Sequence, residues 1–332
     1  MHICLNRIGS FRVRTGVSES GSIIRHLPKI PSCSTAAECE ELMYKVAILG
    51  CENSHANTFL NLVLNKKIVE DIEFIGVYSD DAEAAEKLHA QFGVPVTASY
   101  DAFVGQVDGI MITARHGDNH YKYAKPYIES GIPMFIDKPI TCSEEEALRF
   151  MEELKQHHVP ACGGSICVFD KHVQKLKKAV QAEEYGKVLG GFLRAPINMS
   201  NPYGDFYFYS QHLAQVMQEI FGHYPNKVRA VEKDGTYNCL VRYDDYDVNL
   251  CYVDHNGYYY AGINCADNYV GDRYTLEGCS EQEILEFAGL LKGQKQRETY
   301  EELFAPVYVI NALKRAFESG REEKVQWPEG FC

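Results

Sequence analysis

Apolar and amphipathic stretches alternate along the first half of the chain. Apolar runs with the length of buried strands occupy residues 46–49, 73–78, 107–113, 132–136 and 159–162. Stretches with helical periodicity lie between them, over residues 56–64, 81–92, 119–130 and 143–155. Strands that alternate with helices of about ten residues predict a parallel, doubly wound sheet.

Capping residues mark several of these helix ends. Gly93 follows the second helix and is expected to cap its C-terminus. Ser143 and Glu146 have the spacing of a capping box at the start of the fourth helix. Pro126 lies inside the third helix, so we expect that helix to be less regular.

The pattern changes near residue 165. Strand-like runs now follow one another, several with gaps of hairpin length, at residues 191–197, 227–232, 238–243, 247–254 and 258–264. Helical stretches occupy residues 170–182, 211–221, 281–291 and 301–319. We therefore expect an α/β chain with two domains, in which residues 166–332 form a mainly antiparallel, open sheet with helices on one face. Its tyrosine-rich strands leave amphipathic rings on a sheet face, which is typical of a dimer interface.

The first 42 residues do not share these periodicities. Two interpretations are open. One is an organelle-targeting presequence, because Glu19 is the only acidic residue before Glu38. The other is an extension before a natural start at Met43. We favour the second, because Met43 leads directly into the first strand, and expect residues 1–42 to be disordered or artefactual. A single helix near residues 36–42 is compatible with this interpretation.

Composition excludes several classes of protein. The 332 residues are 45% hydrophobic and carry a formal net charge of −13, which argues against a nucleic-acid partner. No apolar run reaches the length of a membrane span. The twelve cysteines are scattered, without C-x-x-C pairs or zinc spacing, so we expect reduced thiols in a cytoplasm and no metal site.

The candidate catalytic and binding residues follow the ends of predicted strands. Asp137-Lys138-Pro139 follows the apolar run at 132–136, and the segment 114–120 follows the run at 107–113. Ligands of open α/β sheets bind at the carboxyl edge. A lysine beside a carboxylate at that edge is a candidate for proton transfer, although taken alone it is more often a surface ion pair.

The spacing of these segments resembles that of the glucose-fructose oxidoreductase / inositol dehydrogenase / rhizopine-catabolism family. His120 stands eleven residues before Gly131, and Asp137-Lys138-Pro139 then follows, as in the family's histidine, glycine and Glu-Lys-Pro series. The likeness covers nearly all of the chain after residue 44. It implies a Rossmann dinucleotide-binding domain at residues 43–165 and a substrate-binding and oligomerisation domain at residues 166–332.

The resemblance implies hydride transfer between NAD or NADP and a hydroxyl carbon of a sugar, cyclitol or related polyol. The family's catalytic lysine maps onto Lys138 and its histidine onto His212, which would share proton transfer. The alternative for His212 is a capping or core histidine at the start of helix 211–221. A homodimer or homotetramer is also implied.

Three departures from the family pattern matter. The phosphate loop Gly50-Cys51-Glu52-Asn53-Ser54-His55 keeps only the first glycine of G-x-G-x-x-G, and Glu52 brings a carboxylate toward the pyrophosphate. Ser79, followed by Asp80, replaces the acidic residue that holds the adenosine ribose, which is compatible with NADP or with no strong preference between the two nucleotides. Phe208 stands where an aspartate is common, and Asp205 is a possible substitute.

Two groups of side chains are expected to line the site. The cofactor would lie along Gly50, Cys51, Glu52, Asn53, Ser54, His55, Ser79, Asp80, Ala114, Arg115, His116, His120 and Asp137. The sugar or polyol would contact Asn198, Asn201, Tyr203, Tyr207 and Tyr209. Simple helix capping for Asn53 or Ser54, a solvated loop for Arg115 and His116, and a plain turn at 201–204 remain alternatives.

Three functions remain open at this point. The leading hypothesis is an NAD(P)-dependent oxidoreductase. The second is a redox-neutral glycosidase or lyase that keeps its NAD tightly bound. The third is a non-catalytic sugar-binding or sensing protein, which the altered phosphate loop motivates.

Overall fold

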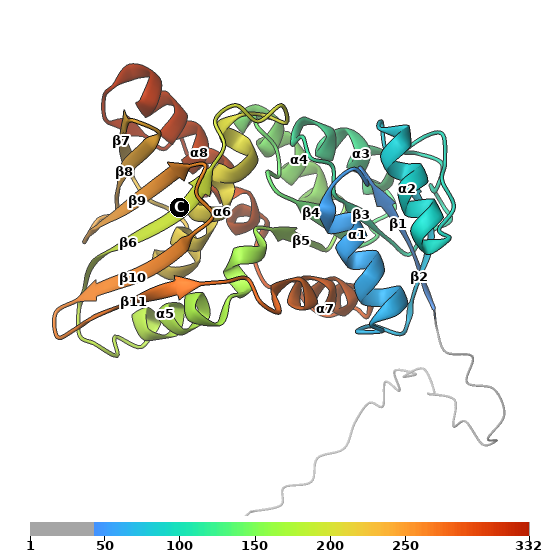
Figure 1. Ribbon diagram of the computed structural model, residues 1–332, viewed down its shortest axis with the longest axis horizontal. Helices are drawn as coiled ribbons and strands as arrows, with labels where there is room; N and C mark the ends of the chain where they lie inside the picture. The colour runs from blue at the N-terminus through green and yellow to red at the C-terminus, as the bar shows by residue number, and fades with distance from the viewer. Residues whose placement is uncertain (1–42, 332) are drawn as a thin grey trace, which may run out of the picture. The chain divides into compact units, whose positions relative to one another are not determined.

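The computed structural model describes residues 43–331, which form one compact unit around two sheets (Figure 1). The predictions for residues 1–42, including the helix near residues 36–42, lie outside the described residues. The expected domain boundary between residues 165 and 166 stays a prediction.

The first sheet is parallel, as expected, with strand order β2-β1-β3-β4-β5. Its strands are β1 (Tyr44–Leu49), β2 (Ile72–Tyr78), β3 (Gly109–Ile112), β4 (Met134–Asp137) and β5 (Ala161–Gly164). The intervening helices are α1 (Ser54–Leu60), continued by the π-helical turn η1 (Asn61–Asn65), then α2 (Ala82–Phe92), α3 (Asp118–Ile128) and α4 (Glu144–Gln156). Strands β3 and β4 are buried on both faces, which is why they contain continuous apolar runs.

The second sheet has seven strands in the order β11-β10-β6-β9-β8-β7-β12. Only the β6–β9 pair is parallel, so the expectation of a mainly antiparallel sheet is confirmed. Its strands are β6 (Val188–Ile197), β7 (Lys227–Lys233), β8 (Thr236–Arg242), β9 (Asp247–Asp254), β10 (Tyr259–Cys265), β11 (Tyr269–Tyr274) and β12 (Glu323–Lys324). The last two were not predicted, because β11 is polar and largely exposed and β12 has two residues.

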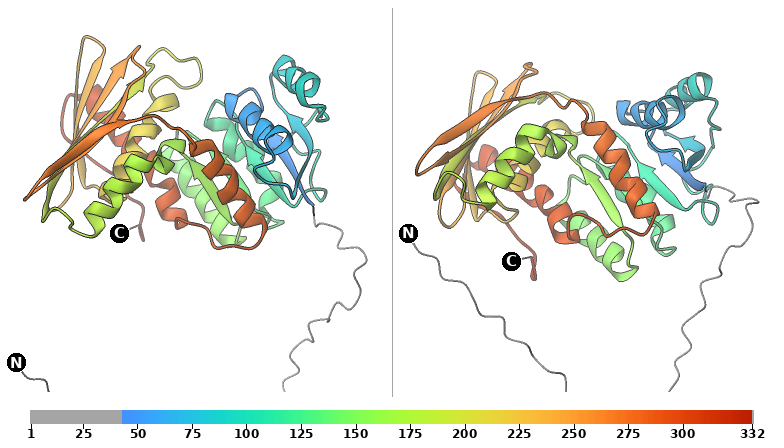
Figure 2. Two further views of the ribbon diagram at one scale, coloured as in Figure 1. Left: turned by 60° about the horizontal axis from the view of Figure 1, so that its bottom comes forward. Right: turned by 90° about the horizontal axis from the view of Figure 1, so that it is seen from below.

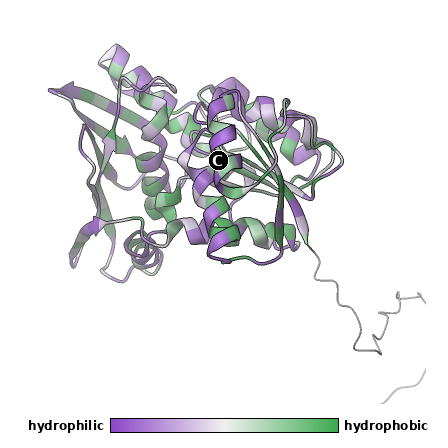
Figure 3. Ribbon diagram, turned by 45° about the vertical axis from the view of Figure 1, so that its right-hand side comes forward, coloured by the Kyte–Doolittle hydropathy of each residue, from purple (hydrophilic) through white to green (hydrophobic). Residues whose placement is uncertain are grey.

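The helices of this half are the 3-10 turn η2 (Ile166–Phe169), α5 (Lys171–Gln181), α6 (Phe206–Phe221), α7 (Cys279–Leu291) and α8 (Tyr300–Ser319). Helices α5, α6 and α8 lie on one face of the seven-stranded sheet (Figure 2). Helix α7 packs against η2, β5 and α1, and so lies beside the five-stranded sheet. Hydrophobic residues are concentrated along the strands of the five-stranded sheet, whereas hydrophilic residues are frequent on the outer helices (Figure 3).

The predicted caps are confirmed with one correction. Gly93 ends α2 in a left-handed conformation with φ 74°, and Pro126 lies inside α3. Ser143 caps α4 by accepting the backbone N–H of Glu146. The reciprocal half of the capping box was wrong, because the Glu146 carboxylate accepts the hydroxyl of Thr141 instead.

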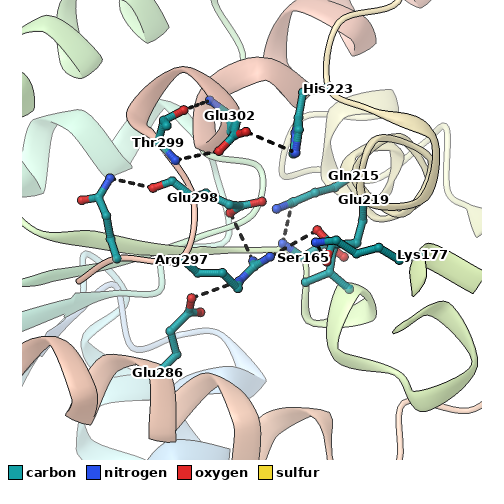
Figure 4. A network of polar contacts seen from close by, with 12 residues as sticks. Ser165, Lys177, Gln215, Glu219, His223, Glu286, Arg297, Glu298, Thr299 and Glu302 are labelled. Atoms are coloured by element: carbon teal, nitrogen blue, oxygen red, sulfur yellow. Dashed lines mark hydrogen bonds and ion pairs between the residues drawn. The ribbon is translucent and has the colours of Figure 1, made fainter. Parts of the chain in front are cut away.

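A cluster of ion pairs joins α6, α7 and the segment before α8 (Figure 4). The guanidinium of Arg297 contacts Glu219 at 3.2 Å, Glu286 at 3.1 Å and Glu298 at 3.2 Å. Glu219 also accepts Lys177 Nζ at 2.8 Å, and its side chain is only 1% exposed. Burial works against the charged form of Glu219, but Arg297 and Lys177 outweigh it and lower its pKa.

Candidate active site

The carboxyl ends of β1, β3 and β4 lie side by side, because these strands are neighbours in the sheet. Gly50 follows β1 with φ 80°, and a Cβ added to it would lie 2.4 Å from the backbone of Ala114, which follows β3. Only glycine fits this close approach. The first glycine of the phosphate loop therefore keeps the tight turn that a dinucleotide-binding fold requires.

A cavity of about 430 Å³ opens at this edge and extends to the second sheet. Nine predicted residues line it, namely Asn53, Ser54, His55, Arg115, Lys138, Asn201, Tyr203, Tyr209 and His212. Four further residues also line it and were missed, namely Ile166, Phe208, Tyr259 and Leu276. All four are apolar or aromatic, and no local pattern marked Ile166, Tyr259 or Leu276. Phe208 was noted only as a departure from the family pattern. A larger hollow of about 720 Å³ lies at the opposite edge of β1, near Tyr44 and Lys292, away from these strand ends.

Lys138 is the central charged group of the cavity wall. It is 4% exposed, and its Nζ donates to the backbone carbonyl of Phe208 at 3.3 Å. The same ammonium lies 4.1 Å from the centre of the Phe208 ring and 5.2 Å from that of Tyr209. Burial lowers the pKa of Lys138, and the neighbouring Asp137 carboxylate only partly offsets this. A lysine in this setting can act as a base.

His212 lies in the second turn of α6, and the prediction that this helix begins at residue 211 was wrong. The helix begins at Phe206 because Phe206 and Phe208 are buried, so the aromatic segment expected to form a loop packs as helix. His212 is 5% exposed, and its Nδ1 lies 2.8 Å from the hydroxyl of Ser165. Burial and the nearby Lys138 hold its pKa well below the usual range, so the ring is neutral.

Two side chains of the phosphate loop, Asn53 and His55, contact the carboxylate of Asp137. Asn53 donates to Asp137 at 2.8 Å, and His55 Nδ1 contacts the same carboxylate oxygen at 2.9 Å. Burial opposes the charged imidazolium, but the carboxylate of Asp137 outweighs it and raises the pKa of His55 to about 9. Asn53 also caps α1 through its side-chain oxygen, as the alternative interpretation of this residue expected.

Glu52 is paired with two donors from neighbouring strand ends. Its carboxylate accepts the hydroxyl of Ser79 at 2.6 Å and the backbone N–H of Arg115 at 2.9 Å. The carboxylate expected to oppose a pyrophosphate is thus already compensated by hydrogen bonds.

The remaining predicted residues lie around the cavity rather than on its wall. Cys51 and Ala114 are buried, and His120 is enclosed between the carbonyls of Ala114 at 2.8 Å and Ile140 at 3.2 Å. Asp80 accepts the hydroxyls of Tyr78 and Tyr123. Elsewhere, the hydroxyl of Tyr207 donates to the Asn311 side chain, and the Asn198 side chain accepts the backbone N–H of Ser200 in its own turn. The side chains of His116, Asp118 and Cys142 bring atoms that can ligate a metal within 4.8 Å of one another.

A buried acid, Glu283 of α7, faces this cluster and was missed from the sequence. It is 1% exposed, and neither carboxyl oxygen has a hydrogen-bond partner among the described residues. Burial raises its pKa to about 8; the charge of His55 works against this rise, and that of Asp137 adds to it. The amphipathic pattern of the helix did not mark Glu283, because a glutamate on a helix is usually at least partly exposed, as Glu281 of the same helix is.

We expect Glu283→Gln to stabilise the protein at alkaline pH and to leave it unchanged at pH 5. The raised pKa means that folding favours the protonated acid, so stability falls as pH rises from the unfolded pKa of 4.5 to about 8. The amide cannot ionise, and the expected gain at pH 9 is on the order of 3 kcal/mol. Urea unfolding at pH 5, 7 and 9 measures it. Glu281→Gln on the same helix, a half-buried surface acid, is the control and should change stability by less than about 0.5 kcal/mol. An equal effect of both variants at all three pH values would contradict the prediction.

Comparisons with known proteins agree with this architecture. Residues 44–164 match the family described as oxidoreductases with an NAD-binding Rossmann fold. Over 107 residues the chain is 26% identical to UDP-N-acetylglucosamine 3-dehydrogenase of Acidithiobacillus ferrooxidans, a match covering 32% of this chain and 34% of that protein. Over 86 residues it is 33% identical to inositol 2-dehydrogenase of Corynebacterium glutamicum, covering 25% of each. These two matches span about a third or less of the relatives' length.

Solved structures extend the likeness to the second sheet. A putative myo-inositol dehydrogenase of Sinorhizobium meliloti 1021 is similar with a TM-score of 0.73 at 16% identity, over 86% of this chain and 100% of that one. At this identity the likeness shows the fold alone, and it covers both sheets. Residues 44–164 thus match the family of oxidoreductases with an NAD-binding Rossmann fold, which is the family that the spacing of His120, Gly131 and Asp137-Lys138-Pro139 resembles.

Proposed function

We propose that this protein is an NAD(P)-dependent oxidoreductase that acts on a hydroxyl group of a sugar, cyclitol or related polyol. The observation that carries the proposal is Lys138, a buried lysine with a lowered pKa, at the edge of the sheet where ligands of this fold bind. His212 shares the same cavity. The names of the matched relatives, which act on inositol and on UDP-N-acetylglucosamine, support the substrate class.

The residues present are compatible with a bound dinucleotide. Gly50 keeps its left-handed turn against Ala114, and the Glu52 carboxylate is held by two hydrogen-bond donors. The backbone of residues 50–54 would hold the pyrophosphate, and Ser79 with Glu52 would face the adenosine ribose. When bound, the nicotinamide exchanges a hydride with the substrate carbon.

Lys138 and His212 would share the proton transfer. A neutral Lys138 amine takes the hydroxyl proton of the substrate while the hydride leaves the same carbon, and it returns that proton in the reverse direction. The neutral ring of His212 hydrogen-bonds to the same oxygen. Phe208, which replaces the family's aspartate, covers the Lys138 ammonium with its ring instead. Asp205 is exposed and does not line the cavity, so we assign it no role.

Side chains of the second half would bind the polyol. Asn201, Tyr203 and Tyr209 offer hydrogen bonds and ring faces to the cavity. Arg115 stacks over the Tyr203 ring at 5.0 Å, which holds that ring beside the cavity. Asn198 and Tyr207, which do not line the cavity, are assigned to support of the loop.

Calorimetry with NAD, NADH, NADP and NADPH, followed by a screen of polyols for nucleotide reduction, tests the proposal. We expect micromolar binding of one nucleotide pair and stoichiometric reduction with at least one polyol. Substrate loss without change in free nucleotide would favour the redox-neutral alternative. Folded protein that binds a sugar but no nucleotide would favour a sensing role. The contacts of Asn53 and His55 with Asp137 would then account for the lost nucleotide affinity, because they occupy polar groups of the phosphate loop.

The exposed face of the second sheet is the surface that we propose for self-association. Leu189, Phe192, Tyr258 and Tyr269 are 38–56% exposed there, and helices cover only the opposite face. Among the described residues, no helix has the length and apolarity needed to cross a membrane. A cytoplasmic location and the choice between dimer and tetramer stay predictions.

A further inference from the structure

Glu52 carries a carboxylate from the loop after β1 to the end of β2. Its Oε2 accepts the Ser79 hydroxyl at 2.6 Å, and its Oε1 accepts the backbone N–H of Arg115 at 2.9 Å. Strands β2 and β3 flank β1, so this one side chain joins three strand ends. The acidic group that the sequence lacks at residue 79 is therefore supplied from another element.

We propose that Glu52 replaces the acidic residue that usually binds the adenosine ribose, and that it makes the site select NAD over NADP. This inference rests on the proposed function, because it concerns the same nucleotide site. It chooses between NAD and NADP, which the serine at residue 79 left open in the sequence.

The hydrogen-bonding capacity of this corner suits ribose hydroxyls. Ser79 donates its single hydroxyl proton to Glu52, and its oxygen accepts the backbone N–H of Asp81 at 3.0 Å. The serine therefore has no proton left for a phosphate. A carboxylate has about four acceptor positions, and two of those on Glu52 remain open. Ribose hydroxyls can donate to them, whereas a 2′-phosphate presents acceptors and negative charge only.

The nearby charges also disfavour a phosphate. Asp80 accepts hydroxyls of Tyr78 and Tyr123, which lower its pKa and keep it ionised. Lys122, the cation beside it, is paired with Asp80 at 3.4 Å. The guanidinium of Arg115 is turned to the substrate side, where it donates to Tyr203 at 3.3 Å. The end of β2 thus carries the carboxylates of Glu52 and Asp80, and the lysine beside Asp80 is already paired.

The test compares the affinities of NADH and NADPH for wild type, Glu52→Gln and Glu73→Gln by calorimetry at fixed salt. We expect wild type to bind NADH at least about 30-fold more tightly than NADPH. Glu52→Gln keeps the size of the side chain and removes its charge. The ratio of the NADPH dissociation constant to that of NADH should therefore fall about tenfold, mainly through tighter NADPH binding. Glu73→Gln is the matched control, because Glu73 is an exposed acid on β2 whose loss changes net charge equally. It should leave the ratio unchanged.

Three results would overturn the inference. Wild type that binds NADPH as well as NADH contradicts the selectivity itself. A preference for NADH that Glu52→Gln leaves intact assigns the selection elsewhere, and Asp80→Asn would then show whether Asp80 carries it. Folded wild type that binds none of the nucleotides overturns the proposed function together with this inference, and so differs from the first two results. If Glu52→Gln does not fold, Glu52→Asp provides a second variant; its shorter side chain should not reach Ser79, and the ratio should again narrow.

Discussion

Lys138→Met is expected to lower turnover about 10³-fold while the protein stays folded and still binds its nucleotide. Methionine fills a similar volume between the Phe208 and Tyr209 rings but carries no exchangeable proton. Removing a buried ammonium that burial already disfavours should cost little stability. Turnover with a polyol found in the screen, nucleotide affinity and thermal unfolding are the three measurements.

The control for this variant is Lys125→Met. Lys125 also lies over an aromatic ring, 5.2 Å from that of Tyr121, but it is exposed on α3. It should keep full activity. Lys138→Arg should be as inactive as Lys138→Met, because a guanidinium does not deprotonate in this pH range. Wild-type activity should rise with pH through a lysine pKa below 10.5. Full turnover by Lys138→Met would remove the lysine from the mechanism.

Arg297→Met is expected to destabilise the fold by about 3–5 kcal/mol at pH 8. Methionine keeps the apolar stem that packs near Phe169 but leaves Glu219, Glu286 and Glu298 facing one another without their shared cation (Figure 4). Burial already raises the pKa of Glu298 to about 7, so protonation of Glu298 can relieve part of the repulsion between the carboxylates. The loss should therefore be smaller at pH 5 than at pH 8.

Urea unfolding of wild type, Arg297→Met and Arg149→Met at both pH values measures this effect. Arg149 forms an exposed pair with Glu145 one helical turn away, and its loss should cost less than about 0.5 kcal/mol at either pH. An Arg297→Met cost as small as that of Arg149→Met would contradict the expected contribution of the buried cluster to stability.

Much of the fold was predictable because its signals are local. The run predicted at residues 132–136 yields strand β4 (Met134–Asp137), since a short apolar run after Gly131 suits a position buried on both faces. Gly93 ends a helix because glycine adopts the left-handed conformation without strain. Helix α6 was predicted five residues too short, because Phe206 and Phe208 are helical only through packing that their neighbours in sequence do not reveal.

The candidate site was predictable in part for the same reason. Lys138 and Arg115 both follow strands of a parallel sheet, and such strands end at one edge, so their meeting in one cavity follows from the strand pattern. His212 joined them through the family resemblance. Tyr259 and Glu283 were not predicted as parts of this region, since an aromatic residue in a strand and one of several acids on a helix carry no distinguishing pattern.

By itself, the sequence determined the parallel sheet, the strand ends that carry Gly50, Arg115 and Lys138, and the family resemblance. Only the tertiary structure decided what the unusual loop residues do. Glu52 meets Ser79 across 27 positions and Arg115 across 63, and Asn53 meets Asp137 across 84. Periodicity and capping depend on neighbours within a turn or a strand, whereas a carboxylate's charge and hydrogen bonds depend on whichever groups folding brings within about 3 Å.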